Sequence, residues 1–385
     1  MKFFVLLYIT FISIEGLLED NVNFAKGRIL QMLPGTEDFN IFTYASDLKN
    51  DSLLIYKMVD LALNNLIGKN IKNQIINKNK LRDFLIHLAE EYNSNTYPDI
   101  NPYHNLFHAS DIVHTLYLYL TRTKKSNPIL FSDTYIKQTE ELEFISNINY
   151  KDLDIFALII AAACHDFRHT GRDNNFYSTY KDKVSFSKIL KEYDYKLELY
   201  HYAEAKKLIE KFDILENLDI FQKERFYKIM KIAIYGTDNS FNKKHAEDLE
   251  KYKYIMNLNN INFINETLDE VKLIMFECFL HAADISNPTK NRDLFITWTD
   301  KINEEFCEQS IEIHSIDETK EINCVGNDDT KFKESELSFF KYVIDIFYLP
   351  FCGVFEQLNY LCENIEKNKI LMERNETIHT LYGNK

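Results

Sequence analysis

The sequence predicts an all-α protein, and three observations lead to this expectation. Only 9 Gly and 6 Pro occur among 385 residues, too few for sandwiches or barrels, which need a turn residue every few positions. Apolar residues recur with the helical period in many segments. Hydrophobic residues form 45% of the chain and charged residues 27%, as in ordinary globular proteins. We therefore expect a compact multi-helix domain.

Helical periodicity places apolar residues on one face in four segments. These residues are Leu81, Phe84, Leu85 and Leu88; Leu153, Phe156, Ala157 and Ile160; Phe276, Phe279, Leu280 and Ala283; and Phe339, Tyr342, Val343 and Ile346. Asn101-Pro102 and Ser126-Asn127-Pro128 are expected to separate helices. Residues 317–331 are expected to form a surface loop. No low-complexity linker or fixed-period repeat follows Asn21, so residues 21–385 are predicted to be one domain.

The first 20 residues stand apart from this domain. Phe3 to Ile14 form an apolar run of twelve residues, and a helix of that length spans ~18 Å, less than the ~30 Å hydrocarbon core. The run has the length of a signal-peptide core, but no small-x-small cleavage site follows it. We expect residues 1–20 to be a hydrophobic leader or the remnant of a membrane anchor, with a leader helix packed on the domain as a further alternative.

The charge balance restricts the partners of the chain. With 45 Lys+Arg against 59 Asp+Glu, the net charge is −14. A protein that binds nucleic acid needs a basic face, so we expect no nucleic-acid partner. Any phosphate chemistry is expected to use metal ions instead of Lys and Arg.

The six cysteines contain no CxxC pair, and a chain of this length has no need of disulfides. We therefore expect reduced thiols, as in an intracellular catalytic domain. The residues are Cys164, Cys278, Cys307, Cys324, Cys352 and Cys362.

Three polar clusters interrupt the apolar helices. On a helix, His104 and His108 would share one face at i and i+4. Such a pair more often consists of two histidines that bind no metal. His165 and Asp166 follow an Ala-rich segment, where burial costs several kcal/mol unless the groups are paired or bound to metal. Asp284 follows another apolar face. On its own, Asp284 would more often cap a helix end.

Considered together, these clusters indicate a metal site. Two His, a His-Asp pair and a distant Asp form a nitrogen and oxygen ligand set suited to divalent metals. A carboxylate such as Asp166 can bridge two ions, which would polarise a phosphoryl group and generate hydroxide at neutral pH. His104 would then remain as a proton carrier.

The fuller strings resemble the class I 3′,5′-cyclic nucleotide phosphodiesterases, a family of HD-type metallohydrolases. YHNLFHASD at Tyr103 to Asp111 is similar to the YHNxxHAxD signature of that family, and HDFRHTGRDNNF at His165 to Phe176 to its HDxxHxGxxNxF. Residues 284–290 resemble its DxSNPTK segment. Trp298-Thr299 and Glu304-Glu305-Phe306 follow in register, and the resemblance extends over nearly everything after the leader.

The resemblance implies an all-α catalytic domain with a binuclear metal site. His108, His165, Asp166 and Asp284 would hold zinc, and Asp166 would also reach a second ion, magnesium or manganese. A bridging hydroxide would attack phosphorus, and His104 would protonate the leaving O3′. Residues that support the metals and their waters would be Tyr103, His169, Glu198, Thr237 and Asp238. Around Glu198 the usual ENHH of the family is replaced by Glu198-Leu199-Tyr200-His201.

The resemblance also places a nucleotide pocket at Asn287, Ile302, Glu336 and Phe339. Ile302 and Phe339 match the residues that clamp the base, while Glu336 stands where the family has Gln. An ionised carboxylate only accepts hydrogen bonds. Guanine offers N1–H and N2–H together, whereas adenine offers one N6–H donor. Glu336 therefore favours cGMP over cAMP, unless it faces solvent or the register differs by a turn.

The predicted function is metal-dependent hydrolysis of a 3′,5′-cyclic nucleotide to the 5′-monophosphate in second-messenger signalling. An HD-type hydrolase of another nucleotide and an inactive cyclic-nucleotide-binding relative remain alternatives. Because the substrates are cytosolic messengers, we expect a cytosolic catalytic domain, membrane-associated through residues 3–14 or otherwise cytoplasmic. The oligomeric state is not predicted.

Overall fold

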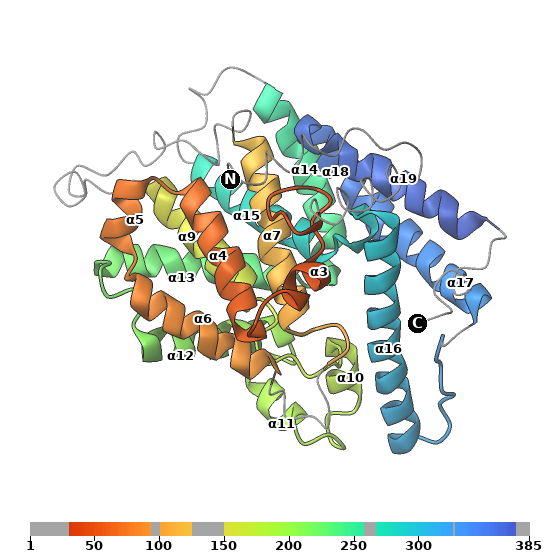
Figure 1. Cartoon of the computed structure of the whole chain (residues 1–385). Coiled ribbons are helices and arrows are strands. Elements are labelled where there is room, and N and C mark those ends of the chain that lie inside the picture. The colour runs from red at the N-terminus through yellow and green to blue at the C-terminus, as the bar shows by residue number, and fades with distance from the viewer. Residues whose placement is uncertain (1–30, 94–100, 125–149, 258–266, 326–327, 375–385) are drawn as a thin grey trace, which may run out of the picture.

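The structure is a computed structural model that describes residues 31–93, 101–124, 150–257, 267–325 and 328–374. Within these ranges it contains helices and no strand, which confirms the all-α prediction (Figure 1). The predicted N-terminal leader lies outside the described residues. The α-helices are α3 (Ile41–Ser46), α4 (Leu54–Leu66), α5 (Lys69–Ile75), α6 (Lys78–Asn93), α7 (Leu106–Thr123), α9 (Tyr150–Cys164), α10 (Asn174–Thr179), α11 (Ser187–Leu190), α12 (Leu197–Phe212), α13 (Ile220–Tyr235), α14 (Asn242–Asn257), α15 (Thr267–Asp284), α16 (Arg292–Ile316), α17 (Asp329–Phe339), α18 (Asp345–Val354) and α19 (Asn359–Glu373).

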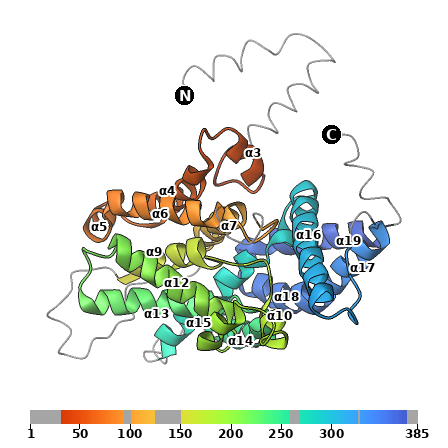
Figure 2. The ribbon, with the colours of Figure 1, turned by 90° about the horizontal axis from the view of Figure 1, so that it is seen from below.

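Helix α7 lies at the centre of the molecule. It packs against α4, α9 and α15 and is buried around nearly its whole circumference. Figure 2 shows α4–α6, α9, α12 and α13 to one side of α7 and α16–α19 to the other. One hydrophobic core extends from Phe39 to Met372, which explains the apolar composition of α7.

The start of α7 corrects one prediction about the histidines. Asn105 is the N-cap residue: its Oδ1 accepts hydrogen bonds from the backbone N–H groups of Phe107 at 2.9 Å and His108 at 3.4 Å. An Asn with extended backbone ends the preceding turn and satisfies these free donors. His104 therefore lies before the helix, and His104 and His108 do not share a helical face.

A buried cluster of charges joins three helices near their N-terminal ends. Arg225 of α13 donates to both carboxylate oxygens of Asp154 in α9, at 2.8 and 2.9 Å. Lys272 of α15 contacts Asp154 at 2.6 Å, and Arg225 also donates to Asp269 of α15 at 2.7 Å. Asp154 is completely buried. Because these helices begin at the same place and pack side by side, their C-terminal ends also lie together, at the cavity described below.

Three of the four predicted apolar faces are buried, but the fourth prediction was wrong. In the segment from α17 to α18 the buried side chains include Phe340, Ile344, Phe347 and Phe351, whereas Tyr342 is 63% exposed and Ile346 39% exposed. Residues Phe340–Ile344 form a π-helical turn. The wider turn shifts the inward face by one residue relative to a regular α-helix.

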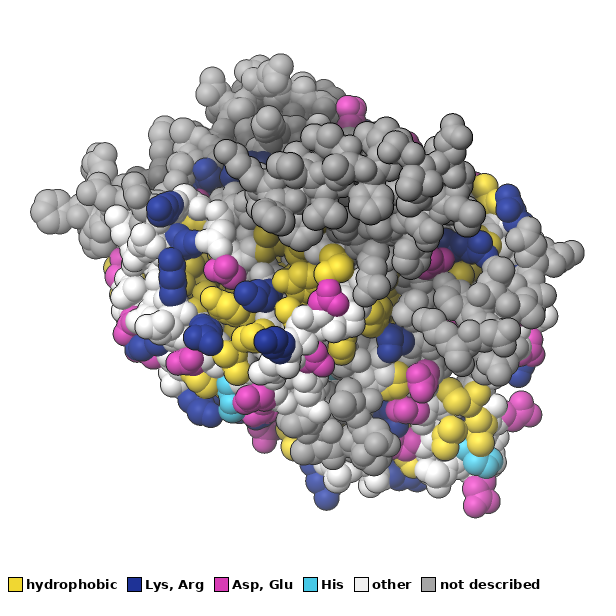
Figure 3. All heavy atoms as spheres, viewed as in Figure 1, with side chains coloured by type: hydrophobic (Ala, Val, Ile, Leu, Met, Phe, Trp, Pro, Cys, Tyr) yellow, Lys and Arg dark blue, Asp and Glu magenta, His cyan; other side chains and the backbone are white. Residues whose placement is uncertain are grey.

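The segment Asp329–Val354 is the one described stretch that is long and apolar enough to cross a membrane, with a mean hydropathy of 1.4. The core helix of a globular domain passes the same test, and six aromatic or aliphatic residues of this segment lie in the hydrophobic core. The apolar run at residues 3–14 lies outside the described residues. On the described part of the face in Figure 3, basic and acidic side chains are interspersed.

The cysteines correct a second prediction. The structure contains disulfides between Cys307 and Cys324 and between Cys352 and Cys362, whereas Cys164 and Cys278 are free and buried. Residues 317–325 and 328 belong to the expected surface loop between α16 and α17, whereas residues 329–331 already belong to α17. The first disulfide fastens the loop to α16. The two cysteine pairs are separated by 17 and 10 residues. Each pair meets because the chain reverses direction between its cysteines, which the spacing of cysteines in the sequence does not reveal.

We predict that Arg225→Met lowers the free energy of unfolding by about 3–5 kcal/mol, because it leaves the buried Asp154 carboxylate without one of its partners. The control is Lys228→Met, since Lys228 is 53% exposed and lies 3.7 Å from Asp269; this change should cost at most about 0.5 kcal/mol. Urea denaturation followed by circular dichroism measures both. Equal stability of the two variants would contradict the proposed role of the charge cluster.

Candidate active site

A cavity of about 470 Å³ opens where the C-terminal ends of α9, α13 and α15 meet α16 and α17. Its volume is typical of a small-molecule site. Most of the residues predicted from the sequence line it. They are Tyr103, His104, Asp166, His169, Glu198, Thr237, Asp238, Asp284, Asn287, Ile302, Glu336 and Phe339. His108 and His165 lie behind the wall, buried to 99% and 100%, and contact the lining carboxylates.

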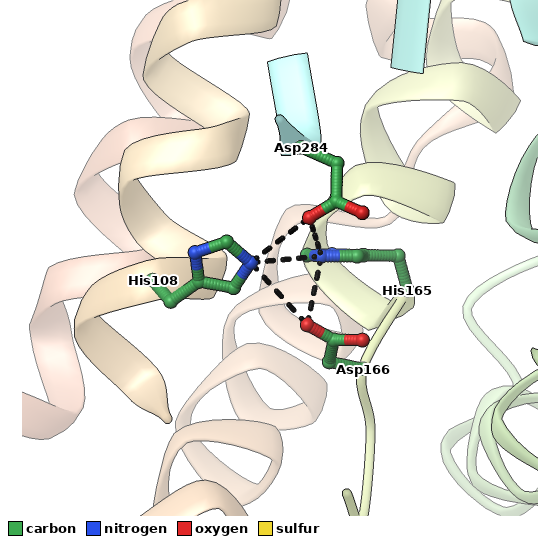
Figure 4. Close-up of side chains that lie close together, drawn as sticks. All are labelled: His108, His165, Asp166 and Asp284. Carbon is green, nitrogen blue, oxygen red and sulfur yellow. Dashed lines mark hydrogen bonds and ion pairs between the residues drawn. The ribbon is translucent and has the colours of Figure 1, made fainter. Parts of the chain in front are cut away.

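Four side chains converge on one point at the bottom of this cavity (Figure 4). His108 Nε2 lies 3.1 Å from Asp284 Oδ1 and 3.3 Å from Asp166 Oδ2. His165 Nε2 lies 3.2 Å from Asp284 Oδ1 and 3.0 Å from Asp166 Oδ2. The two ring nitrogens are 3.3 Å apart. We call these four residues the metal quartet.

The spacing fits a divalent metal ion. Ligand atoms about 2.0–2.1 Å from a tetrahedral ion lie about 3.3 Å from one another, and the contacts within the quartet measure 3.0–3.3 Å. Asp166 Oδ2 is buried and accepts no hydrogen bond of good geometry. A buried carboxylate oxygen without a donor is costly, and a cation at the centre of the quartet would satisfy it.

The local structure prepares three of the quartet residues for this role. The Nδ1 of His165 donates to the carbonyl oxygen of Ala162 at 2.9 Å, which leaves the Nε2 lone pair free to point at the centre. Burial raises the pKa of the Asp166 and Asp284 carboxyls, but the neighbouring histidines, above all His165, hold both pKa values below the usual range. His165 follows α9 and Asp284 ends α15, and the C-terminal end of a helix attracts cations.

His104 lies beside the quartet and is held by one carboxylate. Its Nδ1 forms an ion pair with Glu305 Oε1. The other oxygen of Glu305 accepts from the backbone N–H groups of Tyr103 at 3.1 Å and His104 at 3.0 Å. Burial lowers the pKa of His104, but the charges of Glu305, Asp166 and Asp284 overcome this effect and raise it to about 9. Without a bound cation, His104 is therefore an imidazolium at neutral pH.

The loop after α9 depends on one glycine. Gly171 has a φ of +71°, and a Cβ at this position would lie 2.9 Å from Asn101 Oδ1. Asn101 donates to the carbonyl oxygens of His169 at 2.8 Å and His104 at 3.1 Å. This amide therefore holds the two histidines together, and their rings stack with centroids 3.9 Å apart.

The remaining polar residues predicted near the metals line the wall formed by α12 and α13. Glu198 accepts from Asn174 Nδ2 at 3.1 Å, and burial raises the pKa of Glu198 to about 7. Asp238 pairs with Lys196 at 2.5 Å and accepts from the N–H of Ser240 at 2.8 Å. The hydroxyl of Thr237 donates to the carbonyl of Ile234. Asp238 is therefore partly neutralised.

The far end of the cavity is less polar. Ile302 and Phe339 are half-buried and pack against the hydrophobic core. Glu336 is buried, and its one hydrogen bond among the described contacts is a long one of 3.5 Å from the Thr299 hydroxyl. Burial raises the pKa of the Glu336 carboxyl to about 8. Asn287 donates to the Tyr103 hydroxyl at 2.8 Å.

Sequence reasoning missed two residues that organise this site. Glu305 was noted only as part of a matching string, because a Glu-Glu pair on a helix gives no sign of which carboxylate points inward. Asn101 was interpreted as part of an Asn-Pro turn. Its proximity to Tyr103-His104-Asn105 was the available signal.

The chain is similar to known proteins over the region that contains this cavity. A family model described as 3′5′-cyclic nucleotide phosphodiesterase matches residues 103–365. The chain is 26% identical over 334 residues to a probable 3′,5′-cyclic-AMP phosphodiesterase (pde-4) of Caenorhabditis elegans, covering 83% of this chain and 43% of that protein. It is 30% identical over 212 residues to the mouse (Mus musculus) dual specificity calcium/calmodulin-dependent 3′,5′-cyclic nucleotide phosphodiesterase 1C, covering 54% of this chain and 25% of that protein.

The fold is shared with a solved structure. The phosphodiesterase domain of the RhoPDE fusion protein from Salpingoeca rosetta superposes with a TM-score of 0.67 at 22% identity, covering 90% of this chain and 97% of that one. The chain spans less than half the length of the curated relatives it matches. From the family match, the chain belongs to the 3′5′-cyclic nucleotide phosphodiesterase family.

Proposed function

We propose that this chain hydrolyses 3′,5′-cyclic nucleotides to nucleoside 5′-monophosphates. The observation that carries the proposal is the position of His104 beside the metal quartet, in a cavity large enough for a nucleotide. A ligand set for a cation next to a proton donor is what in-line displacement at phosphorus requires. We assign the catalytic domain to residues 21–385, and substrates that are cytosolic messengers would place it in the cytosol.

The quartet His108, His165, Asp166 and Asp284 would hold a zinc ion, since nitrogen and oxygen ligands in this arrangement suit Zn²⁺. Asp166 would also reach a second ion, for which magnesium or manganese fits the carboxylate-lined wall of Glu198, Thr237 and Asp238. When bound, such cations supply Lewis acidity, which activates water near neutral pH and polarises the phosphoryl oxygens.

The protein side chains would do the rest of the chemistry. His104 would donate its proton from Nε2 to the leaving O3′, because its Nδ1 is occupied by Glu305. Glu305 orients the imidazole and stabilises the charged form. Tyr103, fixed by Asn287, and His169 would hold the surrounding hydrogen bonds. Ile302 and Phe339 would clamp the base.

Glu336 would select the base, and the ionisation state of its carboxyl would determine which base it prefers. Ionised, it accepts from N1–H and N2–H of guanine. Neutral, it can accept from N6–H of adenine and donate to N1. Two donors on guanine favour the ionised form when cGMP is bound. The preference for cGMP is therefore expected to be strongest above the pKa of about 8 in the free pocket.

The direct test is to incubate the full chain with cAMP and cGMP separately and to identify the products by chromatography, with and without a chelator. We expect 5′-monophosphates that disappear with the chelator and return with Zn²⁺ and Mg²⁺ or Mn²⁺. Binding without turnover after metal is restored would support an inactive relative. Turnover of a different nucleotide alone would support the HD-type alternative.

We predict that Glu305→Gln lowers kcat by about 100-fold, at the lower end of what a general acid contributes, because His104 loses the charge that keeps it protonated. As the pH is raised, kcat should also begin to fall at a lower pH in this variant than in the wild type. Glu304→Gln is the matched control, since Glu304 is exposed on the same helix. Equal kcat values and pH profiles for the two variants would contradict the role of Glu305 as the group that keeps His104 protonated.

We predict that the ratio of kcat/KM for cGMP to that for cAMP rises by about tenfold between pH 7 and pH 9, because one well-placed pair of hydrogen bonds discriminates between bases by about 1–3 kcal/mol. Glu336→Gln should make the ratio independent of pH. Glu334→Gln, exposed on the same helix, should keep the wild-type profile. An unchanged ratio in Glu336→Gln would rule out base selection by this residue.

A further inference from the structure

The loop between α16 and α17 folds back along α16 as a strap, which we define as residues 317–325. Three contacts fasten it. The carbonyl of Lys320 accepts from His314 Nδ1 at 2.6 Å, and the N–H of Asn323 donates to the Ser310 hydroxyl at 2.6 Å. The third is the Cys307–Cys324 disulfide. In Figure 1 the segment turns at the lower end of α16 and returns beside it.

The strap connects the two helices that supply the base end of the cavity. On α16, the cavity-lining Phe306 directly precedes Cys307, and Gln309 lies two residues beyond it. On α17, which begins a few residues after the strap, Glu336 and Phe339 line the opposite side. Val325 packs against the hydrophobic core immediately after Cys324. The disulfide therefore links the strap covalently to α16. Because the strap leads into α17, this bond helps to set the distance between the α16 wall and the α17 wall of the cavity.

The two disulfides of the structure differ in their accessibility. Cys307 and Cys324 are both half-buried, and residues 321–323 beside them are exposed. In Figure 3, which has the same view as Figure 1, hydrophobic side chains lie at the surface at the lower right, toward the lower end of α16. In the second disulfide, Cys352 is 5% exposed within the core, whereas Cys362 is half-buried. Both residues of the strap disulfide are thus partly open to a soluble reductant, against one residue of the second disulfide, and thiol–disulfide exchange requires access to a sulfur atom.

We propose that the Cys307–Cys324 disulfide is a thiol-exchange site through which a dithiol reductant controls nucleotide affinity. The proposal rests on the function proposed above. The reductant transfers two electrons and two protons: the S–S bond breaks, two Cys thiols form, and the dithiol becomes a disulfide. Intracellular disulfides of this accessible kind are usually catalytic or redox-sensing instead of structural.

The structure limits what reduction can change. The contacts of Asn323 and Lys320 and the packing of Val325 remain, so the strap loosens without being lost. The metal quartet comes from α7, α9 and α15 and the segments that follow them, to which the strap is not bonded. Glu305 is on α16 two residues before Cys307, but its contacts with His104 and Tyr103 do not involve the strap. Reduction should therefore act on the base clamp and on KM, with little effect on kcat.

The test compares the oxidised full chain with the chain treated with a dithiol, and mass spectrometry of alkylated peptides reports which cysteines are reduced. We expect KM for cGMP to rise by about fivefold on reduction, near the lower end of typical coupling between sites. Cys324→Ser should show the raised KM without reductant and no further response. Cys362→Ser, which removes the other disulfide, should keep the wild-type response.

An unchanged KM with Cys307 and Cys324 shown to be reduced would overturn the proposal, as would free thiols at both positions in the chain purified without reductant. Should Cys324→Ser fail to fold, the wild-type comparison decides alone. If neither redox state hydrolyses cyclic nucleotide, the proposed function fails, and the Kd for a fluorescent cGMP analogue in the two states still tests the thiol-exchange site. Equal Kd values would then overturn it.

Discussion

The site depends on one electrostatic constraint: two imidazole nitrogens and two carboxylate oxygens face one another across 3.0–3.3 Å in a buried place. When His165 is neutral, with its Nδ1 donating to Ala162, its Nε2 and both carboxylate oxygens are acceptors, so the arrangement is unfavourable without a positive charge at its centre. Either protons or a metal ion can supply that charge. The carbonyl partner of His165 Nδ1 and the tetrahedral spacing favour the metal ion.

The fold supports this constraint from a distance. α9, α13 and α15 are tied at their N-terminal ends by the charge cluster of Asp154, Arg225, Asp269 and Lys272. A helix of 15 to 18 residues is about 22–27 Å long. Parallel packing over that length brings the negative ends of the three helix dipoles to the same cavity, where a cation is stabilised. α7 runs in the opposite direction and contributes His108 from its first turn.

Much of the metal quartet could be predicted from the sequence because each ligand lies in a short string at a helix end, where adjacent polar residues stand out against an apolar background. The role of Glu305 could not, since it depends on the rotation of a long helix around its axis. The position of His104 outside α7 follows from capping by Asn105, which competes with helix formation. The inward face of residues 339–346 was misplaced because a π-helical turn does not show in apolar periodicity.

The cysteine prediction was wrong for a related reason. Spacing along the chain excluded a CxxC motif, but Cys324 reaches Cys307 only because the strap reverses direction after α16. The charge of Glu336 is another tertiary property: the sequence supplies a carboxylate, whereas burial beside Thr299 determines how readily it ionises. Short sequence motifs thus specify which chemical groups the site contains, and tertiary packing determines their protonation states.

The most direct test of the account is the metal content of the purified full chain, measured by inductively coupled plasma mass spectrometry. We expect about one tightly held zinc per chain. Asp284→Asn should lose this zinc and cyclic nucleotide hydrolysis, while helicity by circular dichroism is unchanged. A chain that hydrolyses cyclic nucleotides at an undiminished rate with no bound divalent metal would contradict this expectation.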